Sequence, residues 1–381
     1  MTTVGAACYT LTVSFSEKEK KKMYTFSELE ELDILKTGAT PEKVEQMKDE
    51  LRSAYYCENS KAGSLEKFKK EKAEYRKPIK TGYAVIDTML SGGLYRGLYI
   101  IAAMSSMGKT TLLHNIADNI SEQGQDVLYF SLEMGETELT AKSLSRESYI
   151  LDPKNAWTAR QFLTNEIQKG SNSDKAYYKL MEKSGGVYII TEDSEIKTKW
   201  NEDGSLESYL REPTGAVSLD GIRQRAKEHK ELTGKTPVIM IDYLQILRPS
   251  DPRTSDKQAA DEAVRELCSI ARELKTPVLA LSSISRGSYD KEITLASLKE
   301  SGGIEYGADY VIAMQPAKNG LDRPTADELK RCEVRKIELT VLKARLDSMN
   351  TGEVIATYNA KYNYFEFELN PYKPENQIKA F

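Results

Sequence analysis

The chain has 381 residues, of which 40% are hydrophobic and 29% are charged; this length predicts two or three domains with room for a large core. The formal net charge of −4 argues against a surface that binds nucleic acid everywhere, although a local basic loop inside a ring would suffice. Four widely spaced cysteines and only two histidines argue against a zinc site and predict free thiols in a reducing compartment.

The beginning of the chain carries no recognisable targeting signal. Its first residues, MTTVGAACYTLTVSFSEKEKKK, lack the basic start and long apolar core of a secretory signal. No apolar run in the sequence is long enough to span a membrane. We therefore expect a cytoplasmic protein without a membrane partner.

Residues 1–80 are predicted to form an N-terminal extension and linker, because they are rich in Lys and Glu and have few strand signals. The stretch from Pro41 to Tyr56 has a proline at its first turn and apolar residues on one helical face, namely Val44, Met47, Leu51 and Tyr55. Such a helix docks either on the rest of the chain or on a neighbouring subunit. The basic stretch from Ser64 to Lys80 is predicted to be a solvated linker rather than a nucleic-acid patch.

Residues 81–368 are predicted to form one α/β domain. Apolar runs alternate there with helical patterns, which favours a mostly parallel twisted sheet with helices on both faces. The apolar runs are LYIIAA, DVLYFSL, VYIIT, VIMIDYL, PVLALSS, YVIAMQ and IELTVLKA. The polar stretch from Glu192 to Thr214 is predicted to be an exposed insertion, and residues 369–381 a loose C-terminal tail.

The stretch AAMSSMGKTTLLHNIADNI, from Ala102 to Ile120, has the pattern of a phosphate-binding loop, with Ala103 where the first glycine is usual. A loop that holds a triphosphate needs inward-facing N–H groups and the positive end of a helix. Lys109 is expected to bind the β- and γ-phosphates, and Thr110 to bind Mg²⁺. The expected nucleotide-binding residues are Ser105, Ser106, Met107, Gly108, Lys109, Thr110 and Thr111.

The surroundings of this loop fit the same interpretation. An apolar run from Gly97 to Ala103 precedes it, and the residues that follow place apolar side chains on one helical face, namely Leu112, Leu113, Ile116 and Ile120. A strand, a loop and a helix are the order that a P-loop requires. The alternative, a chance Gly-Lys-Thr in a surface turn, does not explain this context.

Two carboxylates follow apolar runs. Asp242 ends the run PVIMIDYLQIL, where a P-loop enzyme holds Mg²⁺ directly or through water. Glu133 follows the run VLYFSLEMG and could accept a proton from the attacking water or orient it. An ordinary aspartate at a strand end would be the simpler interpretation of Asp242 if no P-loop were present.

Cationic side chains near the end of the chain form a further candidate group. Lys343 and Arg345 share one face of a strand, and Asn350-Thr-Gly predicts a turn that returns the chain as a hairpin. With no carboxylate of matching spacing in the hairpin, the pair suggests an anionic target. The alternative is a pair of solvated basic residues.

From Thr81 to about Phe365, the chain resembles the C-terminal motor domain of the DnaB-type hexameric replicative helicases. The elements SMGKT, SLEM, DYLQ and KAR occur in the order of that family and are specific in combination. The resemblance implies a RecA-like P-loop NTPase core and a ring, commonly of six subunits, with ATP between subunits. It also implies single-stranded DNA in the channel, 5′-to-3′ translocation during DNA replication, and a helicase loader as a further partner.

The resemblance also assigns roles to individual residues. Lys109 and Thr110 match the Walker A positions, Asp242 the Walker B aspartate, and Glu133 the catalytic glutamate. Lys343 and Arg345 match the basic pair that reaches the γ-phosphate of the neighbouring subunit, with Arg345 in a catalytic role. Loops that contact DNA in the family correspond here to residues 247–257 and 285–301, which contain the candidates Arg248, Arg253, Lys257, Arg286 and Lys291.

Three departures from the family pattern keep other functions in view. Met104 stands where the family often has Arg, and Ser283 stands where it has a Gln that couples nucleotide state to DNA. Residues 1–80 are too short for the helical collar of the family, so primase binding is not carried over. A stripped relative from a phage or mobile element fits this pattern. The rival functions are a RecA-like regulatory ATPase that switches conformation without unwinding and a non-hydrolysing scaffold.

Overall fold

The computed structural model describes residues 10–13, 22–25, 40–72, 77–191, 195–200, 206–212, 218–247, 254–285, 287, 291–298, 301–318, 323–345 and 354–368. The chain divides into two compact units, Met1–Lys77 and Pro78–Phe381. The candidate tail, residues 369–381, lies outside the described residues. Among those that are described, no helix is both long and apolar enough to cross a membrane.

The first unit contains a strand pair that the sequence did not predict. β1 (Thr10–Val13) pairs antiparallel with β2 (Lys22–Thr25), so the expected short helical extension with few strand signals also contains a strand pair. Both strands are four residues long, and so short a strand leaves little periodic signal in the sequence.

The predicted amphipathic helix is present as α3 (Pro41–Asn59). It begins after Thr40, whose side chain accepts a hydrogen bond from the Lys43 backbone N–H, and Pro41 occupies its first turn. Three of its four predicted apolar positions are buried, namely Val44, Met47 and Leu51. Tyr55 is 58% exposed, which corrects the fourth position. Helical spacing identifies a face but not how far along the helix a neighbour covers it.

The basic stretch that was predicted to be a solvated linker is helical in its first part. α4 (Lys61–Glu71) covers it as far as Glu71, and its Leu65 and Phe68 side chains are exposed. Charge alone therefore misidentified a helix as a linker, because Lys and Glu are also good helix formers.

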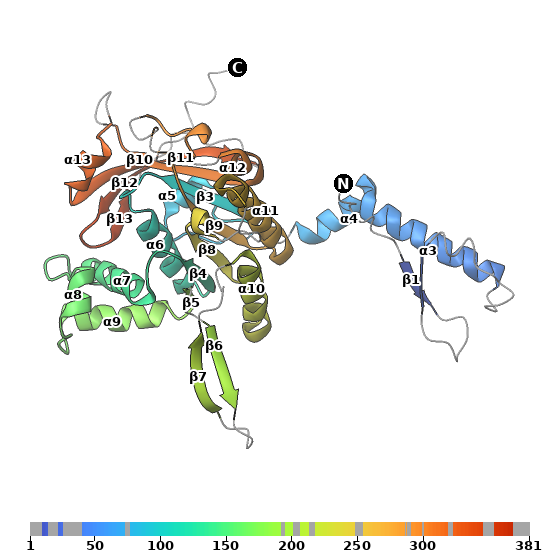
Figure 1. The fold of residues 1–381 in the computed structure, drawn as a ribbon, viewed down its shortest axis with the longest axis horizontal. Coiled ribbons are helices and arrows are strands. Elements are labelled where there is room, and N and C mark those ends of the chain that lie inside the picture. Colours follow the sequence, from blue (N-terminus) through green and yellow to red (C-terminus); the bar gives the residue numbers. More distant parts are fainter. Residues whose placement is uncertain are drawn as a thin grey trace. The chain divides into compact units, whose positions relative to one another are not determined.

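The second unit is built on one nine-stranded sheet (Figure 1) in the order β13-β12-β11-β10-β3-β9-β8-β4-β5. Its strands are β3 (Gly97–Ala103), β4 (Val127–Ser131), β5 (Val187–Ile190), β8 (Val238–Asp242), β9 (Pro277–Ser283), β10 (Tyr310–Pro316), β11 (Val334–Ala344), β12 (Val354–Asn359) and β13 (Tyr364–Phe367). The helices are α5 (Ala84–Met89), α6 (Lys109–Glu122), α7 (Glu136–Leu151), α8 (Ala159–Thr164), α9 (Asn172–Lys183), α10 (Leu219–Thr233), α11 (Asp256–Leu274), α12 (Ser301–Gly307) and α13 (Ala326–Lys330). All seven predicted apolar runs are strands of this sheet.

The sheet has a parallel part and an antiparallel part. The six strands from β10 to β5 pair in parallel. β11, β12 and β13 follow β10 in the strand order and pair antiparallel. α6 and α11 lie on opposite sides of the sheet (Figure 1), and the central strands β3 and β9 between them are buried, apart from the last residue of β9. This is the predicted α/β architecture.

The polar insertion also contains regular structure. β6 (Glu195–Trp200) and β7 (Leu206–Glu212) form an antiparallel two-stranded sheet of their own within the stretch from Glu192 to Thr214. The sequence indicated a polar excursion from the domain but not a hairpin. Composition shows that the stretch does not belong to a core, whereas pairing of the two strands depends on register.

Candidate functional site

The predicted phosphate-binding loop connects the end of β3 to the start of α6. Met104 and Met107 are buried and anchor the loop, whereas Ser105 and Ser106 are exposed. Ser106 and Gly108 have positive φ angles of 69° and 83°, and Gly108 is the N-cap of α6. Because Gly108 caps α6, the free N–H groups of the first turn of this helix lie directly after the loop, and a helix N-terminus in this position favours an anion.

Gly108 is also packed against aromatic rings from the antiparallel part of the sheet. A Cβ at this position would lie 2.7 Å from Cε1 of Tyr358 and 2.9 Å from Cζ of Phe365. These two rings stack on each other with centroids 4.4 Å apart. The glycine is thus required twice, by its backbone angle and by the closeness of the β12–β13 hairpin.

Lys109 lies inside the loop with few polar neighbours. Its Nζ donates to the Ala103 carbonyl at 3.4 Å and to Ser283 Oγ at 3.3 Å. Burial lowers the pKa of Lys109, while the charges of Asp242 and Glu133 act in the opposite direction. An ammonium in this state gains most from an added anion, because it is already removed from water.

Asp242 and Thr110 meet at the carboxyl edge of the sheet. Asp242 ends β8 and is 1% exposed, and the Thr110 side chain donates a hydrogen bond to its carboxylate. Burial raises the pKa of Asp242, and that hydrogen bond opposes the rise. Glu133 follows β4, next to β8 in the sheet, and its charge further raises the pKa of Asp242.

The donor atoms at this position suit Mg²⁺. A hydroxyl and a carboxylate are hard oxygen ligands, and Mg²⁺ usually binds through one or two protein oxygens, substrate phosphates and water. Within the described parts of the chain, no group of three or more His, Cys, Asp or Glu side chains could hold a metal on its own. Thr110 and Asp242 thus fit a metal that arrives with a nucleotide.

Sequence reasoning missed several polar groups around the loop. Lys142 on α7 donates from Nζ to Thr111 Oγ1 at 3.4 Å, and burial lowers its pKa. Thr111 Oγ1 also lies 3.3 Å from the hydroxyl of Tyr358. Gln245, which lies in the DYLQ element, donates to Ser282 Oγ at 2.8 Å. Lys142 carried no signal in the sequence because its position depends on how α7 packs against α6.

Lys343 and Arg345 lie at the opposite edge of the sheet. Tyr310 at the start of β10 pairs with both Tyr99 of β3 and Ala344 of β11, which runs antiparallel. Four residues of β3, about 13 Å at about 3.3 Å per residue, separate Tyr99 from the start of the loop at Ala103. The basic pair is therefore not brought to the P-loop of its own chain.

The basic pair does have partners in the chain, contrary to the expectation from the hairpin alone. Arg345 donates to Asp309 Oδ1 at 2.8 Å and to the carbonyl oxygens of Tyr306 at 2.8 Å and Gly307 at 3.2 Å. Lys343 donates to the carbonyl of Glu305. The carboxylate belongs to Asp309, the residue just before β10, which is why a search within the hairpin did not find it.

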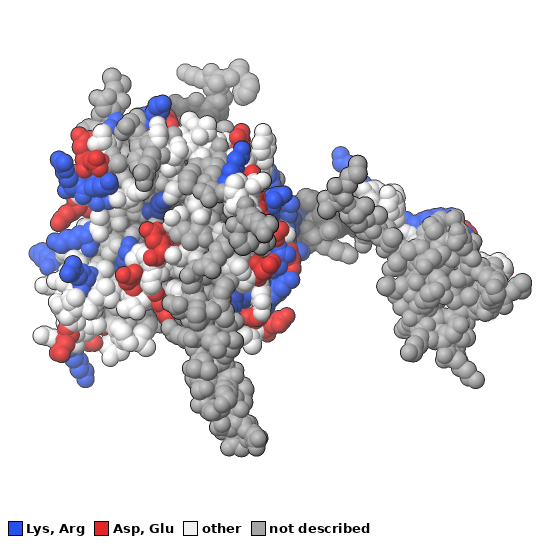
Figure 2. All heavy atoms as spheres, viewed as in Figure 1, with Lys and Arg blue, Asp and Glu red and all other residues white. Residues whose placement is uncertain are grey.

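The predicted nucleic-acid contacts are described only in part. Arg248, Arg253 and Arg286 lie outside the described residues, whereas Lys257 in the first turn of α11 and Lys291 are exposed. On the described part of the face in Figure 2, basic and acidic side chains are interspersed.

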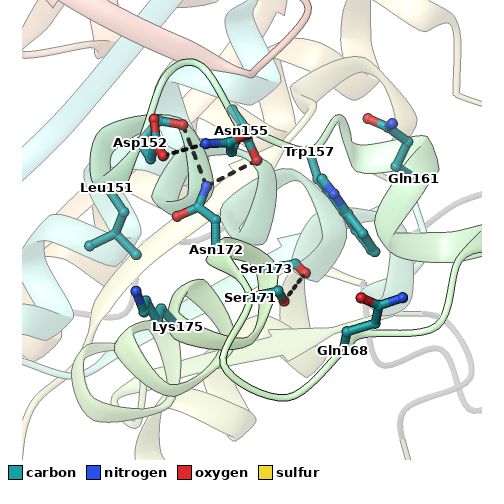
Figure 3. Close-up of a pocket in the computed structure, with 11 residues that line it drawn as sticks. Leu151, Asp152, Asn155, Trp157, Gln161, Gln168, Ser171, Asn172, Ser173 and Lys175 are labelled. Carbon is teal, nitrogen blue, oxygen red and sulfur yellow. Dashed lines mark hydrogen bonds between the residues drawn. The ribbon is translucent and has the colours of Figure 1, made fainter.

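A pocket of about 880 Å³ lies elsewhere in the unit (Figure 3). It is lined by residues of the α7–α9 lobe, including Trp157 and Lys175. Asn172 donates there to the carbonyls of Ser148 at 2.9 Å and Asn155 at 3.2 Å, which ties α9 to the end of α7. None of the predicted site residues lines this pocket, so the chemistry and not the volume identifies the P-loop edge as the candidate site.

Comparisons with known proteins match the same unit. The model of the family described as the DnaB-like helicase C terminal domain matches residues 78–367. The chain is 31% identical to the replicative DNA helicase DnaC of Bacillus subtilis (strain 168), over 75% of this chain and 56% of that protein. It is 28% identical to the replicative DNA helicase DnaB of Helicobacter pylori (strain ATCC 700392 / 26695), over 88% of this chain and 67% of that protein.

Solved structures agree in fold. A solved ATPase domain superposes with a TM-score of 0.62 at 23% identity, over 81% of this chain and 98% of that one. A DnaB-like replicative helicase that was solved in a study of its interactions with primase has a TM-score of 0.60 at 23% identity, over 81% of this chain and 66% of that one. The chain thus spans little more than half the length of the first curated relative.

Proposed function

Because the chain belongs to the DnaB-like helicase C-terminal domain family, we propose that it is an ATP-dependent DNA helicase or translocase. Its curated relatives are named replicative DNA helicases, which favours this function over a regulatory ATPase that switches without unwinding. The observation that carries the proposal is the meeting of Lys109, Thr110 and Asp242 at one edge of the sheet, with Glu133 just after the end of the neighbouring strand β4.

In this proposal, the P-loop edge binds and activates ATP. Lys109 binds the β- and γ-phosphates, and the N–H groups of the loop and of the first turn of α6 bind phosphate oxygens. Glu133 orients the attacking water and accepts its proton. Thr110 and Asp242 hold Mg²⁺, which neutralises charge on the phosphates when bound.

The second part of the active site comes from a neighbouring copy. Arg345 and Lys343 lie at the other edge of their own sheet, so they serve the nucleotide of an adjacent subunit. An arginine that enters in trans stabilises the charge of the transition state. A closed ring, hexameric in this proposal, gives every P-loop such a neighbour.

The proposed nucleic-acid ligand is single-stranded DNA in the channel of the ring. Lys257 and Lys291, together with Arg248, Arg253 and Arg286, are the proposed backbone contacts, because repeated copies of one or two cations suffice to follow a strand. A helicase loader is a further proposed partner. A role in DNA replication and a cytoplasmic location complete the proposal.

The test is ATP hydrolysis by the full chain with and without single-stranded DNA, followed by unwinding of a forked duplex. A translocase should be stimulated several-fold by the oligonucleotide, and DNA binding should weaken steeply as salt is raised, since its contacts are to phosphate. The proposal would be contradicted if DNA did not stimulate ATP hydrolysis, or if the affinity for DNA were the same at low and at physiological salt.

A further inference from the structure

Asp309 connects the basic pair to the strand that leads to the P-loop. Its Oδ1 accepts from Arg345 Nη1 at 2.8 Å, and its Oδ2 accepts from the Leu98 backbone N–H at 2.9 Å. The backbone of Asp309 repeats both links, since its N–H donates to the Leu98 carbonyl and its carbonyl accepts from the Arg345 N–H, each at 2.9 Å. One residue therefore contacts both Leu98 and Arg345 through main chain and side chain.

The fit between this carboxylate and β3 is close. A Cβ on Gly97 would lie 2.8 Å from Asp309 Oδ2, so the first residue of β3 cannot carry a side chain without moving the carboxylate. The side chain of Asp309 is 20% exposed and that of Arg345 is 37% exposed. A charge-assisted hydrogen bond between partly buried groups restricts the motion of the guanidinium more than an ion pair between fully exposed groups would.

β3 joins this contact to the nucleotide site of the same chain. The strand runs from Gly97 to Ala103 without a described irregularity, and the P-loop follows directly. A displacement of β3 on nucleotide binding would therefore move Asp309, and with it the guanidinium of Arg345. Two sites that bias one rigid element are physically coupled.

We propose that Asp309 is a positioning residue for Arg345. It sets the position of the guanidinium that Arg345 presents to the neighbouring subunit, according to the position of β3 in its own subunit. This inference rests on the proposed function, in which Arg345 acts in trans. It assigns to Asp309 a part in communication between adjacent nucleotide sites, in addition to its part in the fold.

The first test is the turnover of Asp309→Asn in the full chain with single-stranded DNA. The amide oxygen still accepts from the Leu98 N–H, but the charge that holds Arg345 is lost. We expect kcat to fall about 10- to 100-fold, the value of a hydrogen bond to a charged group, with the KM for ATP nearly unchanged. Asp327→Asn is the matched control, because Asp327 pairs with Lys330 at 3.0 Å on the surface.

The second test separates positioning from folding by mixing subunits. Rings of Asp309→Asn with Lys109→Ala should regain activity, because the intact P-loop of the first meets the intact Asp309–Arg345 pair of the second. Rings of Asp309→Asn with Arg345→Ala should stay slow. A misfolded Asp309→Asn subunit could not host an active site, so recovery in the first mixture excludes a merely structural defect.

The third test is the double variant Asp309→Asn/Arg345→Ala, which should be no slower than Arg345→Ala alone. The inference is overturned if Asp309→Asn retains wild-type kcat, if the mixture with Lys109→Ala gives no recovery, or if the two losses multiply. Should Arg345→Ala itself retain full turnover, the proposed role of Arg345 in trans fails, and this inference with it. If Arg345→Ala is inactive and Asp309→Asn is fully active, this inference is overturned, but the proposed role of Arg345 in trans stands.

Discussion

The two edges of the sheet carry cations in contrasting surroundings. At the carboxyl edge, the side chain of Lys109 is half-buried near the carboxylate of Asp242, and this burial lowers the pKa of its ammonium. At the amino edge, Arg345 is 37% exposed and hydrogen bonded to Asp309 and to the last carbonyls of α12. One edge is enclosed and prepared for an anion, whereas the other presents a held but accessible guanidinium.

In the proposed function, this difference explains why a single chain holds two incomplete halves of a site. Parallel strands bring the ends of β3, β4, β8 and β9 to the same edge, but β11 runs in the opposite direction. The basic pair at the end of β11 is thereby carried away from the P-loop of its own chain. The predictions below test the two edges separately and then their connection.

The largest expected effect is at the enclosed edge. Lys109→Ala should abolish ATP hydrolysis, because it removes the positive charge that stabilises the transferred phosphate. Far-UV circular dichroism should show an intact fold, and Lys330→Ala, a lysine on the surface of α13, serves as the control. Wild-type turnover in Lys109→Ala would show that the carboxyl edge is not the hydrolytic site.

At the exposed edge, Arg345→Ala should lower turnover about 10³- to 10⁵-fold, the range for an arginine that stabilises the transition state of phosphoryl transfer. Nucleotide binding should remain largely intact, which a fluorescent ATP analogue would measure.

The same variant tests whether the two edges complement each other between subunits. Arg345→Ala and Lys109→Ala are each expected to be inactive, but mixed rings should contain interfaces that pair an intact P-loop with an intact Arg345. Part of the activity should therefore return. Mixed rings shown to form without any recovery would contradict action in trans.

A smaller loss is expected from Glu133→Gln, which keeps the shape of the side chain and removes its basicity. Turnover should fall about 10²- to 10⁴-fold, the usual contribution of a general base, while ATP still binds. Glu138→Gln is the control on the same segment, since Glu138 accepts a hydrogen bond from the Gly135 N–H at the start of α7. Loss of ATP binding in Glu133→Gln would instead assign the residue a structural role.

The smallest predicted effect concerns stability and the connection between the P-loop and the β12–β13 hairpin. Gly108→Ala should lower the free energy of unfolding by more than Gly124→Ala, which is expected to cost about 1–3 kcal/mol through its backbone angle. The φ angles are nearly the same, 83° and 82°, but nothing lies within 4 Å of a Cβ on Gly124. If urea unfolding gives equal losses of unfolding free energy for the two variants, the rings of Tyr358 and Phe365 move aside at no cost.

Local pattern was sufficient for much of this protein. Seven apolar runs predicted seven strands, and the spacing around Gly108, Lys109 and Thr110 predicted a strand, a loop and a helix, because each signal lies within one element. The same reasoning failed at Tyr55 and in the helical stretch before Glu71, where the sequence indicates a propensity but not which neighbour packs there.

What only the tertiary structure decided was which residues from separate elements meet. The sequence by itself predicted the P-loop, its two carboxylates and the basic pair, since each lies in or next to a recognisable element. The contact of Lys142 with Thr111, the rings against Gly108 and the pairing of Arg345 with Asp309 depend on strand order and direction. Residues at least 31 positions apart become neighbours through packing of the whole sheet, and a local pattern carries no information about such contacts.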